Sequence, residues 1–124
     1  MAQNNKEILE RGNAAILAGD NEGFLIYCTE DTEWTFVGNK KLKGKEAVRR
    51  WMASEYKVPP KFTVKNLVAE GDFVTAIGTI SVKDEKANEA DYDYCDVWRF
   101  SNGKIAELTA FVIKAEIKEE NQPL

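Results

Sequence analysis

The spacing of apolar residues predicts helices in the first half of the chain. Apolar residues recur every three or four positions over residues 8–16, and Gly19-Asp20 combines a helix-ending glycine with an N-cap for a second, short helix around residues 21–28. A third helix is expected after Gly44, with its apolar positions on one stripe, and Pro59-Pro60 prevents it from continuing.

Between the second and third helices, residues 33–37 alternate apolar and polar side chains and predict a brief strand. The lysine-rich stretch 40–45 that follows is expected to be a solvated loop that leads into the third helix.

After Pro60 the pattern changes to alternation with a period of two. Turn signals at Glu70-Gly71-Asp72, at the polar residues 84–88 and at Asn102-Gly103 divide this half into four long strands in a meander. Helices that precede such a meander and cover one face of it define an α+β fold. We therefore expect a single domain over residues 1–124, a cone-shaped roll with three N-terminal helices packed on a curved antiparallel sheet.

One strand of the meander carries a carboxylate inside an aromatic stripe. Residues 92–100 alternate so that one face presents Tyr92, Tyr94, Asp96, Trp98 and Phe100. Four aromatic residues mark the inward face, so Asp96 is predicted to point inward and to have a raised pKa. A buried carboxylate is costly unless it serves pocket chemistry or is a structural acid with a hydrogen-bond or ion-pair partner, and the sequence leaves both open.

Composition narrows the function further. The chain is 44% hydrophobic and 31% charged with a net charge of −4, which is ordinary for a globular protein and gives no reason to expect nucleic acid as a partner. No window approaches the roughly eighteen apolar residues of a membrane span, and the N-terminus lacks the apolar region of a signal peptide. Neither membrane association nor secretion is expected.

The sequence contains no histidine and only two cysteines, Cys28 and Cys95, which lie far apart. Histidine-based nucleophile pairs and His-ligated zinc are therefore excluded, and we expect neither a metal nor another cofactor. Free thiols fit a reducing compartment, so a cytoplasmic location is predicted.

The element order, the Gly19-Asp20 break, Glu30-Asp31, Gly44 and above all the run from Asp96 to Phe100 with Asn102-Gly103-Lys104-Ile105 resemble the nuclear-transport-factor-2-like superfamily, specifically its SnoaL-like and ketosteroid-isomerase-like members. The resemblance covers nearly the whole chain. It implies the conical cavity of that fold, although the fold hosts many unrelated functions.

Carried over to this chain, the resemblance places Asp96 where ketosteroid isomerases keep a protonated acid that donates to an oxyanion. It places Phe36 at the position of their catalytic base and Gly12 at that of their oxyanion tyrosine. Gly78 and Ile80 fall where limonene-epoxide-hydrolase-like members need an Arg and an Asp. Neither ketosteroid isomerisation nor epoxide opening is therefore expected.

Three functions remain. The first is a pocket protein that binds a small, mostly apolar ligand with a carbonyl or hydroxyl near Asp96. The second is an isomerase, cyclase or lyase that uses Asp96 for proton transfer, with Tyr94 or Tyr56 as hydrogen-bond donor. The third is a non-catalytic dimerisation module. We predict Asp96 and Tyr94 as catalytic candidates and, as the pocket lining, Trp34, Phe36, Trp51, Tyr56, Gly78, Ile80, Trp98 and Ala110.

The opposite sheet face is also half apolar. Phe73, Ile77, Cys95 and Val97 are expected on the outside, where an antiparallel sheet normally meets water. Such a patch predicts a homodimer through the outer sheet face.

Overall fold

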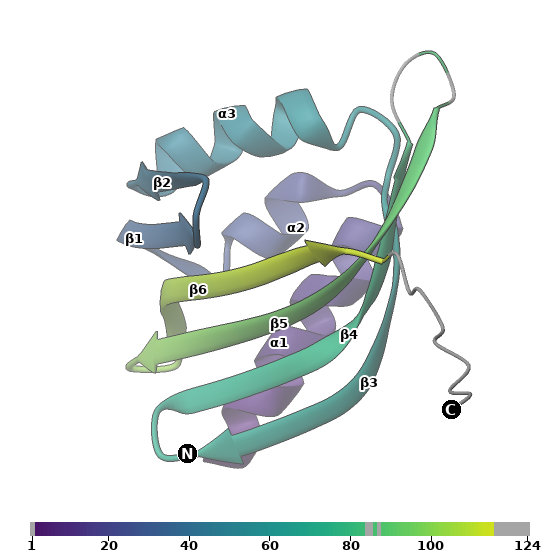
Figure 1. Ribbon diagram of the computed structural model, residues 1–124. Coiled ribbons are helices and arrows are strands. Elements are labelled where there is room, and N and C mark those ends of the chain that lie inside the picture. The colour runs from purple at the N-terminus through teal and green to yellow at the C-terminus, as the bar shows by residue number, and fades with distance from the viewer. Residues whose placement is uncertain (1, 84–85, 87, 116–124) are drawn as a thin grey trace, which may run out of the picture.

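In the computed structural model, helices cover one side of a curved sheet (Figure 1). The structure describes residues 2–83, 86 and 88–115. The helices are α1 (Ala2–Leu17), α2 (Asn21–Leu25) and α3 (Lys45–Glu55). The strands are β1 (Cys28–Phe36), β2 (Lys40–Lys43), β3 (Lys61–Glu70), β4 (Phe73–Lys83), β5 (Glu89–Ser101) and β6 (Lys104–Lys114).

The six strands form one sheet in the order β2-β1-β6-β5-β4-β3. The last four strands are neighbours in sequence order, so the predicted meander and the α+β fold class are confirmed. The sheet is mixed, however, because β1 runs parallel to β6 while its other neighbour β2 is antiparallel. The expected antiparallel pairing thus holds for every pair of neighbouring described strands except β1 and β6.

The region before α3 differs most from the prediction. The lysine-rich stretch contains strand β2, which pairs with β1 from Phe36↔Lys40 to Glu33↔Lys43. Strand β2 pairs through backbone groups, and its side chains are mostly exposed. The sequence therefore shows no alternation of apolar residues that would predict this strand. Lysines on an edge strand also discourage pairing with further strands.

The second helix is shorter than expected, and the first strand is longer. Helix α2 ends at Leu25, and β1 already begins at Cys28. The Ile105 N–H donates to the Tyr27 carbonyl at 2.7 Å, so strand β6 draws this backbone away from the helix. Ile105 lies far from Tyr27 along the chain, so the local spacing of apolar residues could not predict this contact.

The predicted turn residues occupy the positions that need them. Gly19 has φ +83° at the end of α1, and Asp20 caps α2 by accepting a hydrogen bond from the Gly23 N–H at 3.0 Å. Asn102 and Gly103 have φ values of 50° and 78°, as a type I′ hairpin requires. The turn predicted at residues 84–88 lies largely outside the described residues.

Irregular pairing bends the sheet around the helices. The register shifts between Val64 and Asn66 in β3 and between Arg99 and Phe100 in β5. Such bulges increase local twist and curvature. The concave face packs against α1–α3 through a core that includes Leu9, Phe24, Met52, Trp98 and Phe100, and this face also holds the candidate site.

Candidate functional site

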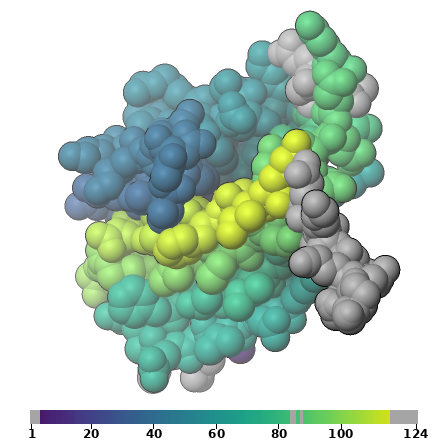
Figure 2. All heavy atoms as spheres, in the orientation of Figure 1, coloured from purple at the N-terminus to yellow at the C-terminus, as the bar shows by residue number. Residues whose placement is uncertain are grey.

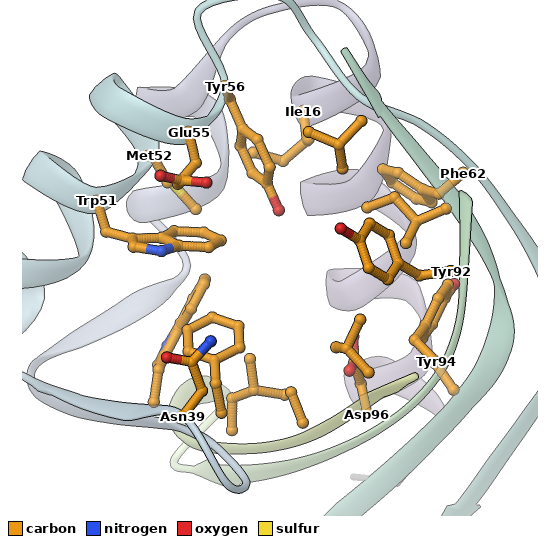
Figure 3. A pocket seen from close by; sticks show the side chains of 18 of the residues that line it. Ile16, Asn39, Trp51, Met52, Glu55, Tyr56, Phe62, Tyr92, Tyr94 and Asp96 are labelled. Atoms are coloured by element: carbon orange, nitrogen blue, oxygen red, sulfur yellow. The ribbon is translucent and has the colours of Figure 1, made fainter. Parts of the chain in front are cut away.

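Strand β5 places Asp96 on the concave face of the sheet, as its position in the aromatic stripe predicted. The residues beside it in the neighbouring strands are Ala76 of β4 and Ala110 of β6. Two methyl side chains leave open space around the carboxylate, and Asp96 points into a cavity (Figure 3).

This cavity has a volume of ≈ 370 Å³, within the range of roughly 300–1,000 Å³ typical of small-molecule sites. Its lining is mainly aromatic and aliphatic. The exposed lining residues come from the β1–β2 turn, the end of α3 and the end of β6, and they include Val37, Asn39, Lys40, Glu55 and Val112. The cavity is therefore entered from this side, and Asp96 is one of its interior groups.

Asp96 is an ionisable group that lacks a partner. Among the described residues, no side chain hydrogen-bonds to its carboxyl and no lysine or arginine pairs with it. Burial alone raises its pKa from 3.8 to about 7. The accessible surface that Asp96 keeps faces the cavity, so near neutral pH its carboxyl group can donate a proton there or accept one.

Aromatic rings line much of the rest of the cavity. The Phe36 and Trp51 rings lie 4.9 Å apart at an angle of 31°, and Tyr56 meets Trp51 edge-on at 5.1 Å. Trp34 and Trp98 are packed edge to face at 5.5 Å. All three tryptophans of the chain line the cavity. A flat apolar ligand would therefore meet aromatic faces and edges.

The two tyrosines considered as hydrogen-bond donors differ in their surroundings. The Tyr94 hydroxyl donates to the Thr63 carbonyl at 3.4 Å, and burial raises the pKa of Tyr94 to about 12. The Tyr56 hydroxyl points into the cavity and has no hydrogen-bond partner among the described residues (Figure 3). Burial, and then the nearby Asp96 carboxylate, raise the pKa of Tyr56 well above its usual value, so it stays protonated.

The structure brings together all of the predicted site residues except Gly78. A Cβ at Gly78 would lie 1.9 Å from the Thr63 carbonyl oxygen and 2.9 Å from the Tyr94 hydroxyl. Gly78 thus lies beneath the Tyr94 side chain and close to the β3 backbone, beside the bulge of that strand. It permits this close approach and does not line the cavity, which corrects the prediction.

Several polar lining residues were missed. Glu55 follows Trp51 by one helical turn, and Asn13 precedes Ile16 by three positions, so helical spacing from the apolar lining residues could have identified both. Asn39 belongs to the β1–β2 turn, and no sequence pattern shows that this turn reaches the cavity.

Of the three positions matched to ketosteroid isomerase residues, Phe36 and Gly12 carry no group for acid–base chemistry. Phe36 lines the cavity with an apolar ring. Gly12 lies against Phe24, whose ring would be 2.8 Å from a Cβ at that position. Phe24 therefore fills space that a side chain at position 12 would need.

Three further observations concern the thiols, metal binding and membrane-spanning helices. Both cysteines are free thiols, and burial raises the pKa of Cys28 to about 12, so this thiol is unreactive. Within the ranges that the structure describes, no group of three His, Cys, Asp or Glu side chains gathers to hold a metal ion. No described helix is long and apolar enough to cross a membrane.

Comparison with protein families places the chain. A SnoaL-like domain matches residues 9–108, and the protein therefore belongs to the SnoaL-like domain family. No curated protein matches the sequence at a significant level. The SnoaL-like match, together with the NTF2-like structures described next, confirms the resemblance to the nuclear-transport-factor-2-like superfamily.

Solved structures share the fold. An NTF2-like protein of unknown function from Cytophaga hutchinsonii is 26% identical, with a TM-score of 0.71 over 91% of this chain and 99% of that one. Another from Burkholderia pseudomallei is 19% identical, with a TM-score of 0.78 over 86% and 88%. TerC, co-crystallised with polyporic acid, is 20% identical, with a TM-score of 0.75 over 87% and 90%.

Proposed function

We propose that this protein binds a small, mostly apolar ligand whose carbonyl or hydroxyl group contacts Asp96. The observation that carries the proposal is a carboxyl group with no side-chain partner among the described residues, on the wall of an aromatic cavity of ≈ 370 Å³. Burying a carboxyl without a partner costs free energy that a ligand group can recover. The protonated acid would donate to a carbonyl, and the carboxylate would accept from a hydroxyl.

A ligand site in this fold is consistent with TerC, a protein of similar structure that has been co-crystallised with polyporic acid. At 20% sequence identity, the similarity to TerC shows a shared fold but not a shared ligand. The ligand class proposed for this chain therefore rests on its own cavity.

Calorimetric titration of the protein with 2-naphthol, 2-acetylnaphthalene and 2-methylnaphthalene tests the proposal. We expect the two oxygen-bearing probes to bind about tenfold more tightly than the hydrocarbon, since hydrogen bonds to ionisable groups are among the stronger ones. Asp96→Leu should abolish that preference. Asp96→Asn should keep the preference for the ketone but lose its pH dependence near pH 7.

Asp93→Asn is the matched control, because Asp93 lies on the same strand, is exposed and points away from the cavity. It should leave all three affinities unchanged. Equal binding of the three probes, or no binding of any, would contradict the proposal.

A second candidate is proton transfer, in which Asp96 acts as acid or base and Tyr56 donates a hydrogen bond. It is favoured by the pKa of about 7 at Asp96, because acid–base catalysis works best with groups that titrate near the working pH. Exchange of the methyl protons of 2-acetylnaphthalene in D₂O should then be faster with the protein than in buffer. The acceleration should disappear in Asp96→Asn; exchange at the buffer rate with the wild type would rule this candidate out for such ketones.

We also propose that the protein forms a homodimer through the outer sheet face. Apolar side chains that are exposed there belong to strands β3, β4 and β6: Val68, Phe73, Ile77, Phe111 and Ile113. Figure 2 shows the side of the sheet that the helices leave uncovered. Contiguous apolar surface of this kind commonly marks a protein interface. A reducing compartment such as the cytoplasm is proposed as the location, since both cysteines are free thiols.

A further inference from the structure

Two charged side chains of opposite sign lie on the rim of the cavity without a partner. Lys40 begins strand β2 and Glu55 ends helix α3; both side chains are exposed, and both line the cavity. Neither forms an ion pair with a described residue, whereas Lys41, the next residue of β2, pairs with Glu33 at 3.5 Å. Lys40 and Glu55 are therefore free to interact with each other.

The packed rings of Phe36 and Trp51 bring these two charges within reach of each other. Lys40 is the cross-strand partner of Phe36, and such partners have Cβ atoms about 5 Å apart. Glu55 follows Trp51 by one helical turn, which places their Cβ atoms about 5–6 Å apart. The two rings lie 4.9 Å apart, and α3 lies beside β2 (Figure 1). Rotation of the long Lys40 and Glu55 side chains can therefore join them while both backbones stay in place.

An ion pair at this place would narrow the mouth of the cavity. Glu55 and Asn39, the residue before Lys40, lie on either side of the Trp51 ring (Figure 3). The interior of the cavity includes Trp34 and Trp98, which are only 3% and 5% exposed. A bridge from one side of Trp51 to the other would therefore lie between these interior residues and bulk water.

We propose that Lys40 and Glu55 form a charge gate, whose ion pair narrows the cavity mouth and whose separation opens it. The unpaired arrangement described above is the open state. Because exposed ion pairs are weak, the closed state is favoured by a factor of no more than about five, so the gate opens readily. It controls access to the cavity whatever the cavity holds, and thus goes beyond the proposed function.

Acrylamide quenching of tryptophan fluorescence in the full chain measures this access without a ligand, because all three tryptophans line the cavity. Acrylamide is uncharged, so salt acts on the gate and not on the quencher. Raising the salt concentration to about 1 M shortens the screening length to about 3 Å and should increase quenching of the wild type. Lys40→Glu and Glu55→Lys should each increase quenching at low salt by up to about fivefold and remove the salt-induced increase. Exchanging both charges, Lys40→Glu together with Glu55→Lys, should restore the wild-type behaviour.

Lys43→Glu is the matched control, because it changes the charge by the same amount on the same strand, at an exposed residue that does not line the cavity. It should leave quenching unchanged. Wild-type quenching that does not respond to salt would overturn the gate. So would a double exchange that is quenched as strongly as the single variants, or an equal increase in Lys43→Glu. Each of these outcomes would leave the proposed function intact, because quenching measures access and not affinity for a ligand.

Discussion

The two faces of the sheet at strand β5 differ in whether a charged side chain has a partner of opposite charge. On the outer face, Arg99 pairs with Glu107 at 2.9 Å, and both side chains are partly in water. On the inner face, Asp96 is half-buried on the cavity wall and has no side-chain partner among the described residues. The same outer face of the neighbouring strand β4 exposes apolar side chains, such as Ile77, which is 42% exposed. The inner face thus leaves a carboxyl group without a partner, and the outer face leaves apolar side chains in water.

The largest effect expected from the inner face is an absence of isomerase activity. Phe36 cannot move a proton, and losing a general base typically slows a reaction by about a hundred- to ten-thousand-fold. Turnover of a β,γ-unsaturated ketosteroid at pH 7, followed by absorbance, should be slower by that factor than with a proficient isomerase. Rates near those of such an enzyme would refute the assignment of Phe36; steroid binding without turnover would agree with it.

The second effect concerns stability. Because the pKa of Asp96 is about 7 in the folded protein and near 3.8 when unfolded, the folded state binds more protons between these values. Stability therefore falls as the pH rises from about 4 to 7 and stays lower above. Asp96→Asn removes this cost and should stabilise the protein at pH 8 by up to on the order of 4 kcal/mol, with little gain at pH 4.

Urea unfolding of both proteins at the two pH values measures that difference, and Asp93→Asn serves as the exposed control. If Asp96→Asn is less stable than the wild type at pH 8, the carboxylate is structural and the contrast between the two faces fails.

The third effect addresses the outer face. In the proposed dimer, Ile77→Lys would bury an unpaired ammonium and should weaken association about a hundredfold or more. Sedimentation at micromolar concentration should show a wild-type dimer and a monomeric variant. Ala14→Lys, on an exposed position of α1, should stay dimeric. A wild type that sediments as a clean monomer would contradict the proposed interface.

The smallest expected effect tests whether Gly78 allows strands β3 and β4 to approach closely. In Gly78→Ala the new methyl group would collide with the Thr63 carbonyl, a backbone atom that cannot move by itself. We expect a loss of about 1–3 kcal/mol in the free energy of unfolding, as for overpacked sites. Thr79→Ala, on the next residue and the other face, should change it by less than about 0.5 kcal/mol. Equal effects would show that Gly78 does not hold the strands close together.

The inner face was predictable because alternation along one strand is local information. Four aromatic residues on one face of residues 92–100 sufficed to orient Asp96. The partners of that strand followed from turn residues such as Asn102-Gly103. The fold class required no more than this order of helices and strands.

The rest depends on contacts between distant segments. Strand β2 and the early start of β1 arise from backbone pairing, which leaves no periodic trace in mostly exposed side chains. Gly78 was assigned to the cavity because glycine suggests space, whereas here the β3 backbone occupies that space. The choice between Tyr94 and Tyr56 as the available hydroxyl depended on the Thr63 carbonyl, 31 positions from Tyr94.

The parallel pairing of β1 with β6 has a consequence for how the chain folds. Thr32 donates a hydrogen bond to the Ala106 carbonyl, 74 positions away, and among the described strands β1 pairs only with β2 and β6. A two-stranded hairpin alone is marginally stable, so β1 and β2 must wait until β6 has been synthesised and has joined β5. Pulse-labelled hydrogen exchange should therefore show β4 and β5 amides protected before those of β1. Until then the cavity lacks one wall, and the apolar side chains of Trp34 and Phe36 are exposed on an incompletely folded chain, where they can promote aggregation.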